Sequence, residues 1–153
     1  MVGKVKVDLN RKKSFAEIMV KFIGKPFKHG GFGPDGYDCI GLVYAYLVEA
    51  GKAANLVINL GEWRLDNYHE LDRRTDHTEA HQKLLEIFMA NGREVPVGEQ
   101  VAGDPVIIKD KSGDLYPAIY TGNGNFMTAF KNTGVQTKKL EKDTFEIIMA
   151  RRI

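Results

Sequence analysis

Cys39 is the only cysteine of the chain and the residue whose type and position could do the most chemistry. It follows Asp38 and begins an apolar run that ends at Gly51, which predicts a buried helix with an aspartate N-cap. A thiol in the first turn of a helix lies near unpaired N–H groups and the positive end of the helix dipole, and both favour the thiolate. Cys39 is therefore a candidate nucleophile, with packing as a small buried hydrophobe as the alternative.

The histidines are the next candidates, because a thiol nucleophile is usually activated by an imidazole base. His29 lies in a glycine-rich loop ahead of Cys39, where we expect it to line the rim of a cleft, with service as a base as the less favoured alternative. His77 and His81 have the i, i+4 spacing of a metal pair on a helix. The His-Glu-x-x-His pattern is not present, so a solvated helix start is favoured, and we expect neither metal nor cofactor.

Trp63 is the only tryptophan and could form, with Tyr68 and His69, an aromatic wall for a sugar or peptide ligand. Core packing is the alternative for these rings. The glycines near Cys39 do not suggest phosphate binding, because no Lys-Ser/Thr pair follows them as a P-loop requires. We therefore expect these glycines to form turns.

Three helices are predicted in the first part of the chain. Apolar residues recur at helical spacing after Ser14 until Gly24, and again from Thr78 until Gly92, on either side of the buried helix that starts at Cys39. The segment from Lys52 to Thr75 shows no clear period and is expected to be irregular. These helices would carry Cys39 and its glycine loop.

Strands are predicted in the last part of the chain, where short β-prone runs are separated by glycines. Asn123-Gly124, between two of these runs, predicts a tight hairpin. Helices followed by consecutive strands indicate an α+β domain, with helices packed on an antiparallel sheet of about five strands. The predicted strands are Pro105–Lys109, Leu115–Thr121, Phe126–Phe130, Val135–Lys139 and Glu146–Arg151.

Two linked motifs carry a resemblance to a known family. The segments Gly24-Lys-Pro-Phe-Lys-His-Gly-Gly31 and Asp38-Cys-Ile-Gly-Leu-Val43 resemble the glycine loop and cysteine motif of the NlpC/P60 papain-like peptidases. Ala102-Gly-Asp-Pro-Val106 and Ala118-Ile-Tyr-Thr-Gly-Asn-Gly124 are similar to that family's strand motifs. The resemblance extends from about Ser14 to the C-terminus, and it is greatest to the short members found in phage tails and prophages.

The resemblance implies a papain-like fold and cleavage of peptide bonds in peptidoglycan, commonly next to D-glutamate, by a cysteine, a histidine and a third polar residue. Carried over by position, the nucleophile is Cys39, the histidine position holds Tyr116, and the orienting position holds Thr128. A tyrosine that assists the nucleophile in many members falls on Phe27. The substrate-binding residues that we expect in the cleft are Phe27, His29, Asp38 and Trp63.

Replacement of the histidine by Tyr116 bears directly on activity. A phenol with a pKa of about 10 is a protonated donor at neutral pH and a poor acceptor for the thiol proton. All four histidines precede the predicted strands, so a small shift in alignment does not place one there. We predict weak or absent peptidase activity, with two alternatives: a non-catalytic binding or structural module such as a tail component, or a cysteine acyltransferase or thioesterase.

Composition limits the remaining classes. The net charge of +2 among 153 residues argues against nucleic-acid binding, and no run approaches the ~20 apolar residues of a membrane span. We expect one domain over residues 1–153, with 1–13 as an N-terminal extension. Because no signal-peptide pattern is visible, we expect a cytoplasmic or phage-associated protein. The expected partners are a peptidoglycan peptide, or another amide or acyl substrate, and phage tail proteins.

Overall fold

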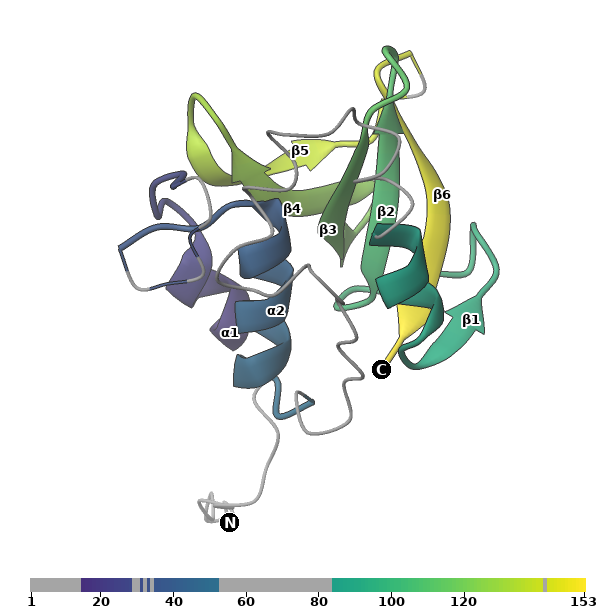
Figure 1. Cartoon of the computed structure of the whole chain (residues 1–153), viewed down its shortest axis with the longest axis horizontal. Coiled ribbons are helices and arrows are strands. Elements are labelled where there is room, and N and C mark those ends of the chain that lie inside the picture. The colour runs from purple at the N-terminus through teal and green to yellow at the C-terminus, as the bar shows by residue number, and fades with distance from the viewer. Residues whose placement is uncertain (1–14, 29–30, 32, 34, 53–83, 142) are drawn as a thin grey trace, which may run out of the picture.

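The computed structural model describes residues 15–28, 31, 33, 35–52, 84–141 and 143–153 (Figure 1). The named helices are α1 (Phe15–Phe22) and α2 (Cys39–Glu49), and residues 84–89 are also helical. The predicted extension at 1–13 and the predicted irregular segment from Lys52 to Thr75, apart from Lys52 itself, lie outside the described residues. Within the described part of the chain, no helix has the length and apolar character needed to cross a membrane.

The two named helices begin and end where the sequence predicts. Ile18 and Phe22 form the buried face of α1, and Gly24, with φ of 87°, follows its end. The Asp38 side chain caps α2 by accepting a hydrogen bond from the Gly41 N–H at 2.8 Å. The predicted aspartate N-cap is therefore present at the residue before Cys39.

In the described residues, six antiparallel strands form one sheet in the order β1-β6-β2-β3-β4-β5. The sequence predicts about five strands, and the additional one is the short β1, which pairs with the last strand. Asn123 and Gly124 have φ of 54° and 75°, the positive values that a type I′ hairpin turn needs. The strands are β1 (Arg93–Val95), β2 (Pro105–Asp110), β3 (Leu115–Gly122), β4 (Asn125–Phe130), β5 (Gly134–Lys139) and β6 (Phe145–Arg152).

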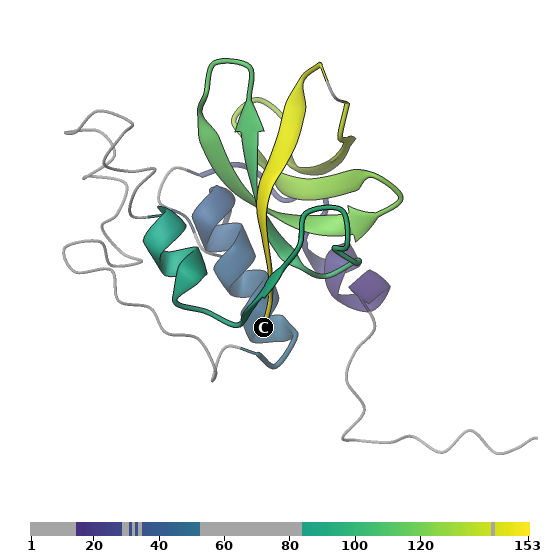
Figure 2. The ribbon, with the colours of Figure 1, turned by 90° about the vertical axis from the view of Figure 1, so that its right-hand side faces the viewer.

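The core lies on both faces of this sheet. Ile119 and Met127 pack with α1 and α2, while the neighbouring Ala118 and Phe126 belong to a second cluster with β2 and β6. This alternation follows from the two-residue period of a strand. Figure 2 shows the helices together on one side of the sheet, and α2 packs against β3 and β4. The N-terminus of α2 is thereby held beside the strands that carry Tyr116 and Thr128.

Arg151 joins β6 to the helix at 84–89. Its Nε donates to the Asn91 carbonyl at 2.7 Å and its Nη2 donates to the Gly92 carbonyl at 2.8 Å. The Asn91 side chain donates in turn to the Ile87 carbonyl at 2.7 Å. The Ile87 carbonyl is in the last turn, where carbonyls have no partner within the helix, so the Asn91 side chain stabilises that turn and Arg151 holds the residues that follow it.

A buried ion pair holds the other side of β6. Asp104 is 4% exposed and accepts hydrogen bonds from Nε and Nη2 of Arg152 and from the Val101 N–H. The hydroxyl of Tyr46 lies nearby, and burial, together with the Asp104 charge, raises the pKa of Tyr46 to about 12. The pair links the segment before β2 to the end of the last strand.

Candidate active site

Cys39 is the first residue of α2 and is partly exposed. The Asp38 carbonyl accepts from the Leu42 N–H at 2.9 Å and closes the first turn, while the Asp38 carboxylate takes the Gly41 N–H. Asp38 is 5% exposed, so its side chain is occupied with this cap. Its expected contact with substrate stays a prediction.

The loop before α2 folds back on itself and delivers Asp38 to the helix. The Lys28 and Tyr37 N–H groups donate to the Tyr37 and Pro26 carbonyls, both at 3.0 Å, and the Asp38 N–H donates to the Gly31 carbonyl at 2.9 Å. A Cβ on Gly31 would lie 2.6 Å from the Gly36 carbonyl oxygen. Only glycine fits this crossing, which gives the glycine motif a structural role consistent with the predicted turns.

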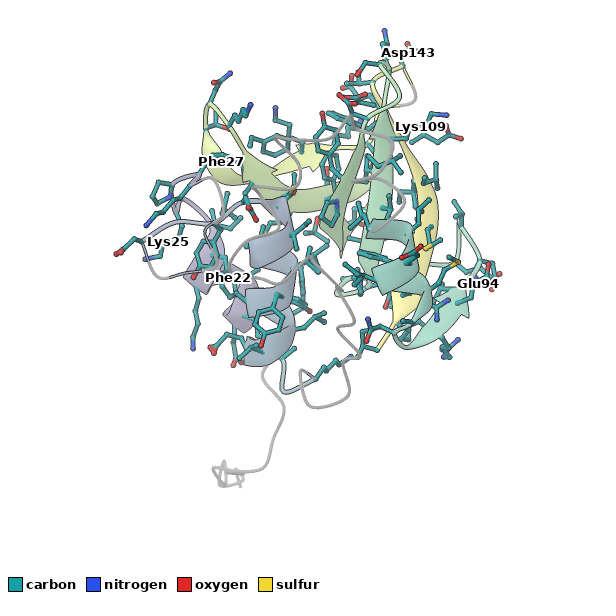
Figure 3. The ribbon with its side chains drawn as sticks, in the orientation of Figure 1. Phe22, Lys25, Phe27, Glu94, Lys109 and Asp143 are labelled. Carbon is teal, nitrogen blue, oxygen red and sulfur yellow. The ribbon has the colours of Figure 1, made fainter. Side chains whose placement is uncertain are left out.

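Phe27 lies in this loop and packs its ring against the core between the helices and the sheet (Figure 3). It pairs with Tyr37 through an isolated bridge. His29 and Trp63, the other two expected substrate-binding residues, lie outside the described residues. The same is true of His69, His77 and His81.

Tyr116 is on β3 and is half-buried. Its hydroxyl donates to Oδ2 of Asp110 at 2.8 Å. Burial, the hydrogen bond to Asp110 and the charges of Asp110, Asp114 and Cys39 raise the pKa of Tyr116 well above its usual range. Tyr116 is thus a neutral phenol that donates to Asp110.

Asp110 stands at the end of β2 and is held by the hairpin that leads to β3. Its Oδ1 accepts from the N–H and Oγ of Ser112, at 3.0 and 2.7 Å, and from the Asp114 N–H at 3.0 Å. Burial raises the pKa of Asp110, but the hydrogen bonds from Ser112, Tyr116 and Asp114 outweigh it and lower the pKa below its usual value. The orientation of the Asp110 carboxylate is therefore fixed, and it accepts a hydrogen bond from the Tyr116 hydroxyl.

Sequence reasoning does not single out Asp110. A signal was present, because Asp110-Lys-Ser-Gly-Asp114 is a tight turn between two predicted strands. Ile108 pairs with Tyr116, so Asp110 and Tyr116 are diagonal neighbours on one face of the sheet. The register of the hairpin, once known, brings the two side chains together.

Thr128 is on β4 and is 3% exposed. Its Oγ1 donates to the Pro117 carbonyl on β3 at 3.0 Å, so its proton goes to the backbone next to Tyr116. The partner that the structure gives to the Tyr116 hydroxyl is Asp110. The orienting role expected of Thr128 stays a prediction.

The arrangement combines a thiol at a helix N-terminus with a phenol that remains protonated at neutral pH. Cys39, Tyr116 and Thr128 come from α2, β3 and β4, which pack together. Among the residues that the structure describes, no three His, Cys, Asp or Glu side chains gather where they could hold a metal ion. The chemistry to be explained is that of the thiol and its polar neighbours.

Solved structures with a similar fold are NlpC/P60 domains. The NlpC/p60 domain of the peptidoglycan hydrolase SagA superposes with a TM-score of 0.58 at 18% identity, over 91% of this chain and 96% of that one. NlpC1 from Trichomonas vaginalis gives 0.58 at 23%, over 90% of this chain and 42% of that one. The peptidoglycan hydrolase RipB from Mycobacterium tuberculosis gives 0.53 at 21%, over 90% and 62%. This chain therefore spans less than two thirds of the last two proteins. No curated protein matches it in sequence.

The sequence pattern of the NlpC/P60 family matches residues 24–151, from the glycine loop through most of β6. This range includes the cysteine motif at the start of α2 and the strands that carry Tyr116 and Thr128. It agrees with the fold, in which helices pack on an antiparallel sheet. The chain belongs to the NlpC/P60 family.

Proposed function

We propose that this chain is a cell-wall module of the peptidoglycan cysteine endopeptidase type, with Cys39 in the nucleophile position and with weak or lost peptidase activity. Membership of the NlpC/P60 family and the peptidoglycan hydrolases among proteins of similar fold support the cell-wall assignment. One observation supports the loss of activity. Tyr116 stands in the histidine position, and its hydroxyl donates a hydrogen bond to Asp110.

Amide hydrolysis by a thiol needs two proton transfers. The Cys39 proton must leave as sulfur attacks the carbonyl carbon, and the departing amine must receive a proton. Tyr116 is already protonated and its raised pKa makes it a poorer acid, because burial and the hydrogen bond to Asp110 favour the neutral phenol. Tyr116 therefore serves neither step as an imidazole would.

Digestion of purified peptidoglycan tests the proposal. We expect the unaltered protein and Cys39→Ala to release equally little peptide. Tyr116→His, and Tyr116→His combined with Thr128→His, should raise release in a Cys39-dependent way. Tyr120→His is the matched control, because Tyr120 lies on the same strand and its hydroxyl accepts from Gly124. Efficient, Cys39-dependent release by the unaltered protein would exclude the proposed loss of activity.

A second candidate is binding without hydrolysis, as in a structural component of a phage tail. The observation that favours it is that the hydroxyls of Tyr116 and Thr128 both donate their hydrogen bonds to other groups of the protein. Pelleting with insoluble peptidoglycan should then retain the unaltered protein and Cys39→Ala equally. The predicted phage or prophage origin, with tail proteins as partners, is tested by co-purification from infected cells.

Acyl transfer or thioester hydrolysis is a third candidate, because a thiolate leaving group needs no proton. The position of Cys39 at the α2 N-terminus supports it, since that position favours the nucleophilic thiolate. Mass spectrometry after exposure to a peptidyl thioester should then detect an acyl adduct on Cys39 and none on Cys39→Ser under the same conditions. No adduct on either protein would exclude this candidate.

A further inference from the structure

We propose that the outer edge of β5 is a binding surface for a polyanion, a phosphodiester polymer of the cell wall. We call this surface the β5 edge. The inference rests on the proposed function in one respect, the placement of the protein at the cell wall, and it does not involve Cys39. The members of the β5 edge are five exposed lysines, Lys25, Lys28, Lys131, Lys138 and Lys139.

Two segments that are far apart in the sequence form the β5 edge. The Gly24 N–H donates to the Val135 carbonyl at 2.9 Å, and the Val135 N–H donates to the Lys25 carbonyl at 2.8 Å. A Cβ on Gly134 would overlap the Lys25 carbonyl oxygen, so the two backbones are in direct contact. The loop after α1 therefore lies alongside the start of β5, and its lysines belong to the same surface as those of the strand.

The charged residues of these two segments are all basic. Residues 24–28 and 130–139 contain the five lysines and no Asp or Glu, whereas the whole chain has a net charge of only +2. The rest of the chain is therefore net negative. Within the described residues, none of the five lysines makes an ion pair, and the carboxylates nearest to them along the chain, Asp35 and Glu141, are both exposed. The positive charge concentrated on the β5 edge favours an anionic ligand.

The backbone of β5 adds hydrogen-bond donors to this surface. The N–H of Val135 points away from β4, because the loop after α1 accepts from it, whereas the Leu140 N–H donates to the Gly124 carbonyl beside β4. Peptide groups alternate between the two sides of a strand, so the N–H groups of Thr137 and Lys139 point to the outer edge as that of Val135 does. An anion at the β5 edge can therefore accept hydrogen bonds from the backbone as well as from lysine side chains.

Lys138 is held in place on this surface. Its Nζ lies 4.1 Å from the centroid of the Phe130 ring, and the residue remains exposed. The contact with the ring restricts a long side chain without neutralising its charge. Less conformational entropy is then lost when an anion binds to Lys138.

The chemistry of the surface fits a polymer with separated single charges better than an added peptide strand. A peptide that extends a sheet needs a row of free backbone groups, but Val135 is already paired with the loop and the Lys139 carbonyl accepts from the Glu141 N–H at 3.1 Å. A lysine ammonium binds phosphate as a point charge and needs no planar arrangement of acceptors. A wall phosphodiester polymer has such charges at regular intervals, and a protein that acts at the wall would meet it.

The experiment is a titration of end-labelled poly(glycerol phosphate) with the protein, followed by fluorescence anisotropy at several salt concentrations. The test variant combines Lys25→Gln with Lys139→Gln, which removes one charge from each segment. We expect the dissociation constant to rise about twenty-five-fold, or roughly five-fold for each lysine near an anionic surface. The slope of log affinity against log salt should fall by about 0.7 for each lysine, because fewer counterions are released.

Lys109→Gln combined with Lys111→Gln is the matched control, because it removes the same net charge from two other exposed lysines. These two lysines flank Asp110, and Figure 3 shows Lys109 and Lys25 on opposite sides of the molecule. The control should raise the dissociation constant by less than about two-fold, because charges beyond a Debye length are screened. Circular dichroism of both variants verifies that the fold is retained.

Equal weakening in the two double variants would overturn the proposal, because it would show attraction to net charge alone. Absence of binding by the unaltered protein would also overturn it, since lysines on an edge strand can serve only to prevent pairing with another strand. Equal affinity for poly-glutamate or for duplex DNA would exclude the wall polymer as the preferred ligand. Cys39→Ala should bind as the unaltered protein does. Failure of the peptidoglycan digestions therefore leaves the binding result intact, and failure of binding leaves those digestions to be judged on their own.

Discussion

Arg152, near the end of the chain, binds the buried carboxylate of Asp104 with two nitrogens, Nε at 3.0 Å and Nη2 at 2.7 Å. The side chain of Asp104 is 6% exposed and that of Arg152 is 31% exposed. The two residues are 48 positions apart: Asp104 lies immediately before β2, and Arg152 is the last residue of the neighbouring strand β6. Loss of the cation would leave a carboxylate buried without its partner.

Arg152→Met should therefore destabilise the fold. Removing the cation leaves a carboxylate that is buried without its charged partner, and this is destabilising, so the loss should clearly exceed that of an exposed substitution. Urea denaturation measures it. Arg93→Met is the control, because Arg93 is exposed and is the pairing partner of Arg152; it should change the free energy of unfolding by less than about 0.5 kcal/mol. Equal losses in both variants would contradict the prediction.

Gly31→Ala should disturb the loop that delivers Asp38 and Cys39. The added methyl group would meet the Gly36 and Lys28 carbonyl oxygens at 2.6 and 2.9 Å, and both are backbone atoms. We expect about 1–3 kcal/mol of lost stability, together with a changed rate of Cys39 alkylation.

Gly98→Ala provides the comparison for Gly31. Gly98 has φ of 105°, and a Cβ there meets no atom within 4 Å. Its replacement should cost stability through backbone strain alone and leave the alkylation rate of Cys39 unaltered. A changed rate in this variant would show that the assay reports general loosening of the fold.

Asp110 should contribute to stability at neutral pH and not in acid. Burial raises its pKa, but the hydrogen bonds from Ser112, Tyr116 and Asp114 lower it by more. The pKa in the folded state is therefore below that in the unfolded state. A depressed carboxyl pKa gives stability that is present above the unfolded value of about 3.9 and is lost as the pH falls through the folded value. Denaturation between pH 2 and 6, at about one-unit steps, should show a smaller acid loss for Asp110→Asn than for the unaltered protein. Asp143→Asn should follow the unaltered protein; an acid loss in Asp110→Asn equal to that of the unaltered protein would contradict the prediction.

Tyr46 and Tyr116 should ionise later than an ordinary tyrosine. Burial is the first cause for both, with Asp104 acting on Tyr46, at a pKa of about 12, and Asp110 acting on Tyr116. A raised phenol pKa gives stability that is complete below about pH 10 and is lost as the pH rises through the folded value. In a pH titration followed by tyrosinate absorbance, Tyr46→Phe and Tyr116→Phe should each lose part of the absorbance increase that occurs above the ordinary tyrosine pKa. Removal of signal near pH ~10 instead would show an unperturbed phenol.

The sequence predicts those features that depend on nearby residues. The Asp38 cap, the Asn123-Gly124 turn and the strands after Pro96 each follow from local patterns, and all are present. The strand β1 is not predicted, because it has three residues, two of them exposed and charged. Its pairing with β6 is what forms it.

Contacts between distant elements are harder to predict. Cys39 and Tyr116 are identified by resemblance to a family, whereas the Asp110 contact depends on the register of β2 and β3. The partner of Thr128 is a backbone carbonyl, which no side-chain pattern reveals. His29 and Trp63 lie outside the described residues, so their predicted roles in the cleft stay predictions.

Arg151 and Arg152 are neighbours on β6, so their side chains leave the strand on opposite faces. Arg151 binds the carbonyls after the helix at 84–89, and Arg152 binds Asp104 before β2. Opening of β6 would break both contacts at once. We therefore expect this helix, β1 and β6 to exchange their amide hydrogens as a single cooperative unit, with one common free energy of opening in native-state exchange. Arg151→Lys, which lacks the planar fork, should uncouple the helix from the two strands and speed its exchange alone.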